Sequence, residues 1–197
     1  MKKEIENAIE LIDFIYDSPC SFFAVKNIKK ILYDNEFIEL DEKKQWKLEK
    51  GKKYFLSKND SAIFVFSIDN EIDLKNHGYK IIAAHTDSPA IKIKSSPEII
   101  NENKYIKLNT EIYGGPILNT WFDRPLSMAG RVTLAGDSPL SPSVRFFKVD
   151  RPLFVIPNLA IHLQNKSQKD NINPQLEILP LAGDVDGNND NEYINKI

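Results

Sequence analysis

A histidine and an aspartate, His85 and Asp87, form the pattern on this chain that is best suited to chemistry. One imidazole nitrogen can bind a metal ion while a carboxylate two residues on orients the ring through the other nitrogen. The alternative interpretation is a structural histidine followed by an aspartate that caps a helix. Because His-x-Asp is a short pattern, its spacing alone leaves both interpretations open.

The segment before this pair indicates how the two side chains would be positioned. Residues 79–84 form a short, mostly apolar run entered through Gly78. Such a run is typical of a central strand in a parallel sheet. Ligands of open α/β sheets bind at the carboxyl ends of strands. We therefore expect His85 and Asp87 to lie at such a strand end.

The N-terminal part of the chain predicts helices followed by strands. Apolar residues recur there first at helical spacing, then alternate with lysines on both sides of Gly51, and then form a denser run over residues 61–68. These patterns indicate amphipathic helices, a hairpin with one solvated face, and a further strand. The predicted elements are a helix over residues 5–16 ended by Ser18-Pro19, a helix over 22–32, a strand at 37–40, a hairpin turning at Gly51, and a strand over 61–68.

After residue 90 the pattern changes to short alternating runs separated by glycine, proline and aspartate. Many short strands with turn residues between them are typical of a β-rich lobe. We therefore expect a domain boundary near residues 90–95. The strand-like runs are residues 91–94, 105–112, 132–134, 144–149 and 153–156.

The composition argues against several classes of function. The chain of 197 residues has 26 Lys and Arg against 28 Asp and Glu, a net charge of −2. Such a charge provides no field for nucleic acid or an anionic membrane. Cys20 is the single cysteine, which fits a reducing compartment. The charged start has no signal peptide core, and no apolar stretch has transmembrane length. We expect a soluble cytoplasmic protein.

Two other chemical patterns fail, a calcium loop on its spacing and a serine hydrolase triad on its geometry. With Asp184 as the first ligand of a calcium loop, Asn189 and Asn195 occupy the positions that require glycine and a closing carboxylate. We expect the acidic tail to be a mobile loop. A serine hydrolase triad within residues 85–88 fails because strand neighbours point to opposite faces, whereas a triad needs a linear relay.

Six segments, taken together and in order, resemble the aspartyl aminopeptidase family of cocatalytic zinc metallopeptidases. Each segment is modest alone, but six in family order across most of the chain are specific. The segments are residues 13–25, 83–89 (Ala-Ala-His-Thr-Asp-Ser-Pro), 113–115, 121–131 (beginning Trp-Phe-Asp-Arg-Pro-Leu), 149–152 (Val-Asp-Arg-Pro) and 156–163 (Ile-Pro-Asn-Leu-Ala-Ile-His-Leu).

This resemblance implies an α/β fold with two incomplete domains. Residues 1–92 would be the N-terminal segment of a metallopeptidase catalytic domain, an α/β/α sandwich, and residues 93–197 an inserted β-rich dimerisation domain. The resemblance also implies removal of N-terminal Asp or Glu from peptides at a site with two zinc ions, other divalent cations being possible. The implied assembly is a homo-oligomer of dimers, a dodecamer in the family.

The resemblance also implies roles for three residues. His85 matches the family's histidine ligand, Asp87 matches the aspartate that braces it, and His162 matches a histidine that contacts substrate in a neighbouring subunit's site. Without the family, His162 is simply a residue on an alternating strand. The Asp-Arg pair at 123–124 follows a tryptophan and is expected to pin a loop.

The matched segments do not include a complete catalytic site. The family's remaining metal ligands, bridging carboxylate and glutamate general base would all lie farther along than residue 197. A catalytic zinc site needs about three protein ligands, and the matched motif supplies one. We expect an N-terminal fragment that is inactive alone. The alternative is a non-catalytic oligomerisation or regulatory module derived from such an enzyme.

Overall fold

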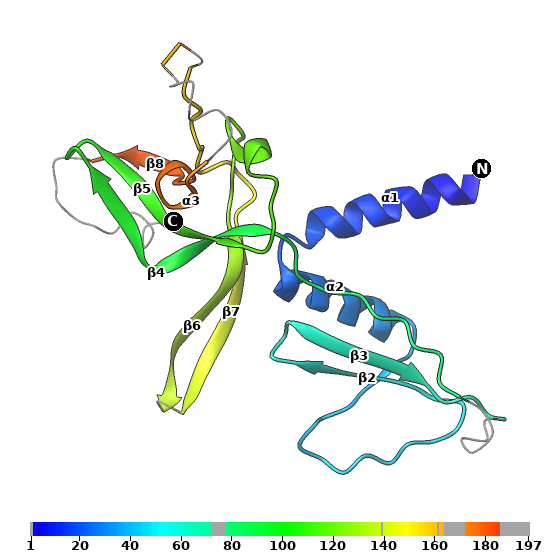
Figure 1. Cartoon of the computed structure of the whole chain (residues 1–197). Helices are drawn as coiled ribbons and strands as arrows, with labels where there is room; N and C mark the ends of the chain where they lie inside the picture. The colour runs from blue at the N-terminus through cyan, green and yellow to red at the C-terminus, as the bar shows by residue number, and fades with distance from the viewer. Residues whose placement is uncertain (1, 72–77, 139, 161, 164–171, 186–197) are drawn as a thin grey trace. The chain divides into compact units, whose positions relative to one another are not determined.

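A computed structural model describes residues 2–71, 78–138, 140–160, 162–163 and 172–185 of the chain. The chain divides into two compact units (Figure 1). The first unit joins Met1–Ser88 to Ala129–Phe147, and the second joins Pro89–Met128 to Lys148–Ile197.

The first unit begins with the two predicted helices, which the structure confirms as α1 (Lys2–Asp17) and α2 (Ser21–Asp34). The corner between them is tied by Asn27, whose side-chain amide donates to the Asp17 carbonyl at 2.9 Å and the Ser18 hydroxyl at 3.1 Å. Helix α2 buries Ala24, Val25 and Leu32, whereas none of the residues of α1 is buried. The apolar stripe predicted for the first helix is therefore exposed to solvent in this chain.

A three-stranded sheet follows, in the order β1-β2-β3. Its strands are β1 (Ile38–Glu39), β2 (Lys53–Lys58) and β3 (Ala62–Ser67). Strand β2 pairs in parallel with β1 and antiparallel with β3. Phe55 is fully buried and meets the ring of Tyr33 from α2 edge-on at 5.2 Å. Helix α2 and β2 thus share one small aromatic core.

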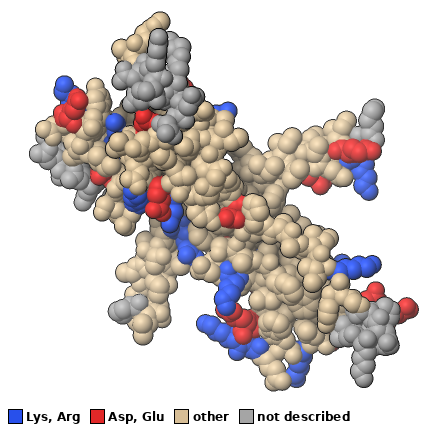
Figure 2. All heavy atoms as spheres, in the orientation of Figure 1, with Lys and Arg blue, Asp and Glu red and all other residues tan. Residues whose placement is uncertain are grey.

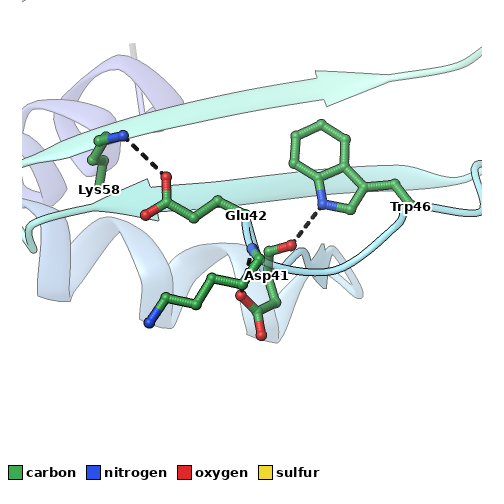
Figure 3. Close-up of polar contacts among 5 residues, drawn as sticks. Asp41, Glu42, Trp46 and Lys58 are labelled. Carbon is green, nitrogen blue, oxygen red and sulfur yellow. Dashed lines mark hydrogen bonds and ion pairs between the residues drawn. The ribbon is translucent and has the colours of Figure 1, made fainter.

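The predicted hairpin at Gly51 is wrong, because the hairpin turn lies at Asn59 and Asp60, between β2 and β3. Both residues have positive φ angles, 52° and 53°, which Asn and Asp tolerate better than most side chains. Trp46 lies outside any strand and donates from its indole N–H to the Asp41 carbonyl at 2.7 Å (Figure 3). The loop before β2 is also tied to that strand by an ion pair between Glu42 and Lys58, at 3.1 Å (Figure 3).

A two-stranded sheet of β6 (Ala129–Ser138) and β7 (Ser141–Lys148) belongs to the first unit rather than the second. This sheet contacts helix α2 through Phe146, whose ring stacks on that of Phe22 with ring centroids 5.8 Å apart. The division of catalytic and dimerisation domains at residues 92 and 93 stays a prediction, since the compact units follow spatial proximity and not ancestry.

The second unit is built on the sheet β4-β5-β8, with both pairings antiparallel. Its buried cluster joins Ile106 and Leu108 of β5 to Phe154 and Ala182. The predicted strands at 91–94 and 105–112 are confirmed, whereas the run at 153–156 forms only isolated bridges. The elements are β4 (Ala90–Asn101), β5 (Tyr105–Tyr113), the 3-10 helix η1 (Leu118–Trp121), α3 (Pro174–Glu177) and β8 (Leu181–Asp184).

The central strand predicted over residues 79–84 is wrong. These residues have no regular secondary structure, and the side chains of Ile81 and Ile82 are 82% and 99% exposed. A strand exists only through hydrogen bonds to a neighbouring strand, and within the described ranges no strand pairs with this segment. The mixed α/β class is nevertheless confirmed. The predicted acidic loop runs from residue 183 to 195. That prediction is wrong for Gly183 and Asp184, which belong to strand β8, and residues 186–195 lie outside the described residues.

The described surface has no extended region of one charge on the face that Figure 2 shows, where basic and acidic side chains are interspersed. None of the helices in the described part of the chain combines the length and apolarity that a membrane crossing requires.

Candidate metal centre

The His85 ring is held through one of its nitrogens by Asp87. Nδ1 of His85 lies 2.6 Å from the main-chain oxygen of Asp87 and 3.1 Å from its carboxylate Oδ1. In the neutral imidazole, a nitrogen between two acceptor oxygens is the one that carries the proton, and Nε2 then has the lone pair that a metal ion requires. The His85 side chain is 80% exposed and that of Asp87 46%, so the pair is open to solvent.

The alternative role of Asp87 as a helix cap is wrong. The chain after Asp87 enters strand β4 at Ala90, so there is no helix at this point for the aspartate to cap. The carboxylate instead contacts the imidazole two residues earlier.

Thr86, which lies between His85 and Asp87, anchors this segment, a role that the sequence did not predict. Its hydroxyl donates to the Ser61 carbonyl at 2.6 Å, and the contact is partly buried. Ser61 lies directly after the hairpin turn at Asn59 and Asp60. A small hydroxyl residue between two polar, chemically active neighbours was the only signal of this anchor in the sequence.

His162 belongs to the second unit and lies in a turn, not on the alternating strand that its sequence context indicates. The amide of Leu163 donates to the Ala160 carbonyl at 2.8 Å, which closes that turn. The side chain of His162 is exposed.

Asp123 pins a loop, as expected. Its carboxylate accepts the backbone N–H of Asn158 at 2.9 Å, while its own N–H donates to the Ile156 carbonyl at 2.9 Å. The aspartate thus clamps the segment that leads to His162. Asp150 of the second Asp-Arg pair contacts Lys148 at 3.6 Å.

Two ionisable groups of the first unit with shifted pKa values, Tyr33 and Glu39, contact each other at a place in the sequence well before His85. Burial raises the pKa of Glu39, but hydrogen bonds from Lys29, Tyr33 and Ser57 outweigh it and hold that pKa below its ordinary value. The Lys29 ammonium lies 2.6 Å from Glu39, and the hydrogen bond to Glu39 raises the pKa of Tyr33. The network ties α2 to β1.

A family model described as aminopeptidase I zinc metalloprotease (M18) matches residues 14–196 of the chain. The chain belongs to the M18 aminopeptidase family. The family resemblance inferred from six short segments is therefore confirmed, and with it the membership of His85 in a metallopeptidase sequence.

Relatives of this M18 chain are similar over nearly all of its length. A probable M18 family aminopeptidase 2 from Clostridium acetobutylicum is 51% identical over 199 residues, which cover 100% of this chain and 46% of the relative. A protein of the same description from Pseudomonas savastanoi is 39% identical, covering 95% of this chain and 42% of the relative. The chain spans less than half the length of these curated relatives.

Solved structures show the same fold. In a structure of the Ape4 and Nbr1 complex, the matching chain has a TM-score of 0.83 and 38% identity, covering 91% of this chain and 34% of that one. An M18 aminopeptidase from Thermotoga maritima has a TM-score of 0.79 and 25% identity, covering 99% of this chain and 43% of that one.

Zinc, which the family description names, suits an imidazole that a carboxylate orients. His85 therefore fits one ligand position. Across the residues that the structure describes, however, no three His, Cys, Asp or Glu side chains lie close enough together to hold a metal ion. A catalytic zinc site needs about three protein ligands, so the described residues do not complete one by themselves.

Proposed function

We propose that this chain is the N-terminal part of a zinc-dependent aminopeptidase that removes N-terminal Asp or Glu from peptides, and that it is inactive by itself. The observation that carries the proposal is the His85 imidazole, braced through Nδ1 by Asp87 at 3.1 Å in a chain of the M18 family. The aspartyl preference is supported by the resemblance of the six segments to aspartyl aminopeptidases.

In this proposal, His85 supplies Nε2 to one of two divalent ions, zinc or a related cation. Asp87 fixes the tautomer and orientation of the ring and raises its basicity as a ligand. When bound, such ions polarise a carbonyl group and lower the pKa of a water molecule. The remaining ligands and the glutamate general base would come from residues outside this chain.

We also propose that the protein acts as a cytoplasmic homo-oligomer, built from dimers, in which His162 of one subunit contacts peptide substrate at a neighbouring site. The exposed position of His162 in a turn supports this role, since a side chain must project from its own subunit to reach another. Molecular mass by light scattering tests the assembly, and a monomer at working concentration contradicts it.

The test of the main proposal compares this chain with a full-length protein that carries it. Zinc content and hydrolysis are measured with peptides that begin with Asp, Glu or Ala. We expect no hydrolysis by this chain, and hydrolysis with a preference for Asp and Glu by the full-length protein with two bound zinc ions. His85→Ala should remove at least one zinc. Two zinc ions retained by the His85→Ala variant contradict the metal role of His85.

A second candidate is a non-catalytic oligomerisation or regulatory module. Like the main proposal, it accounts for the lack of three neighbouring metal-binding side chains in the described part of the chain. It predicts oligomers and no zinc-dependent hydrolysis even by the full-length protein. Turnover of Asp- or Glu-terminated peptides by the full-length protein excludes it.

A further inference from the structure

The segment that carries His85 is tied to the first unit through a side chain on its other side. The side chains of His85 and Asp87 are exposed, whereas Thr86 between them is half-buried. The Thr86 hydroxyl donates to the Ser61 carbonyl at 2.6 Å, across 25 residues of sequence. Because residues 79–84 pair with no strand in the described ranges, no sheet ladder orients the approach to His85.

The Ser61 carbonyl is a suitable anchor because Ser61 is the last residue of a turn whose backbone conformation is fixed by a hydrogen bond. The backbone N–H of Ser61 donates to the Lys58 carbonyl at 3.2 Å, which closes the turn. Its central residues, Asn59 and Asp60, both have positive φ, as in the type I′ turns that match the twist of hairpin strands. Ser61 precedes β3, so its carbonyl lies outside the run of residues that forms that strand.

The same turn is held by a residue that lies 72 positions away in the sequence. Arg131 of β6 donates from Nη1 to the main-chain oxygen of Asn59 at 3.1 Å and to its side-chain oxygen at 2.9 Å. The guanidinium carbon lies 4.5 Å from the centre of the Phe22 ring, a distance at which cation–π attraction operates. Arg131 is thus fixed by α2 while it holds the turn.

We propose that Thr86 and Arg131 are positioning residues of the M18 metal centre, acting through the turn at residues 59–61. Thr86 fixes the position and orientation, relative to Ser61, of the backbone that carries His85 and Asp87. Arg131 fixes the turn to which Thr86 is bonded. This inference rests on the proposed role of His85 as a metal ligand, and it extends the centre to a strand from a distant part of the sequence.

The test measures zinc affinity of the full-length protein by competition with a chelator, alongside thermal unfolding of the metal-free protein. Thr86→Val removes the hydroxyl at almost constant shape, and Thr86→Ser keeps it. Thr120→Val is the matched control, because it removes a similar hydroxyl-to-carbonyl bond, to Ile117 at 2.7 Å, in the second unit. Outer-shell partners of metal ligands typically contribute about 10- to 100-fold to affinity.

We expect Thr86→Val to weaken zinc binding about tenfold, with Thr86→Ser and Thr120→Val close to the wild type and all metal-free melting temperatures similar. In this chain alone, Thr86→Val should also speed amide hydrogen exchange at residues 85–88. Arg131→Gln should weaken zinc binding in the same direction, and it provides the test if Thr86→Val does not fold.

The inference and the proposed function fail in different ways. Unchanged zinc affinity in both Thr86→Val and Arg131→Gln, with His85→Ala strongly weakened, overturns the positioning role alone. Thr86→Ser as weak as Thr86→Val also overturns it, because the hydroxyl then has no part. Unchanged affinity in His85→Ala overturns the metal role of His85 itself.

Discussion

Asp87 contacts His85 twice, through its carboxylate at 3.1 Å and through its main-chain oxygen at 2.6 Å, and both contacts involve Nδ1. A substitution at residue 87 therefore removes one of the two contacts and leaves the other. The carboxylate contact adds charge, which increases the electron density available at Nε2, whereas the main-chain contact determines only the ring's orientation.

Replacing Asp87 with Ala should weaken zinc binding by the full-length protein about 10- to 100-fold, because the ligand loses its anionic partner. Asp87→Asn should have an intermediate effect, since its amide oxygen can still accept from Nδ1. Chelator competition measures both. Asp137→Ala, at an exposed aspartate of β6, is the control and should leave the affinity unchanged. Wild-type affinity in Asp87→Ala contradicts a bracing role.

Replacing Ile82 with Lys tests whether the exposed apolar segment at residues 79–84 is covered in a longer protein. Ile82 is 99% exposed in this chain, so the substitution should change the free energy of unfolding of this chain by no more than about 0.5 kcal/mol. In the full-length protein we expect the free energy of unfolding to fall by about 2–4 kcal/mol, because the lysine at position 82 would be buried without a partner of opposite charge. Chemical denaturation measures both values.

The control for this substitution is Ile117→Lys, at an apolar residue that is 73% exposed in the second unit. A full-length Ile82→Lys variant as stable as the wild type would show that residue 82 stays in solvent. The interpretation of residues 79–84 as a strand of a larger sheet would then be wrong in the longer protein as well.

Replacing Thr110 with Val should destabilise the second unit. The Thr110 side chain is 2% exposed, and its hydroxyl donates to the Ile178 carbonyl at 2.8 Å. Valine has nearly the same shape but leaves that carbonyl without this donor, which costs about 1–2 kcal/mol. Urea denaturation measures the change, with Thr133→Val on the exposed part of β6 as the control. Equal losses in the two variants would argue against a specific buried hydrogen bond.

Glu39 should make the stability of the first unit depend on pH. Its pKa in the folded chain lies below the ordinary value of 4.5, so it stabilises the fold above that value, and this contribution is lost as the pH falls through the folded pKa. Glu39→Gln should cost about 0.5–1 kcal/mol at neutral pH, because the Lys29 contact at 2.6 Å is partly exposed. The difference between wild type and variant should vanish in acid.

Denaturation of wild type and Glu39→Gln across the acidic range measures this difference. Glu49→Gln, at an exposed glutamate, should show no such pH dependence. A cost of Glu39→Gln that stays constant from neutral pH into acid would show that the charge of Glu39 is not what stabilises the fold.

Local patterns in the sequence were sufficient for the helices and several strands. Apolar residues at helical spacing predicted α1 and α2, a dense apolar run predicted β3, and alternation predicted β4 and β5, because these patterns reflect the geometry of a single segment. The hairpin was misplaced for a local reason too. Gly51, with a φ of 76°, and the Asn59-Asp60 pair both suit a turn, and the pairing of Tyr54 with Phe66 selects the second.

The sequence by itself therefore determined which two residues contact each other at the proposed metal site, since the His-x-Asp spacing lets Asp87 brace His85 without help from the rest of the fold. Only the tertiary structure decided what holds that pair in place. The Thr86 contact spans 25 residues and the Arg131 contact 72. Such contacts depend on the hand of a turn and the packing of separate strands, and no local pattern of residues encodes either of these. The same reason explains why the strand predicted over residues 79–84 is absent. The sequence shows that these residues are mostly apolar, but they can form a strand only by pairing with a neighbouring strand.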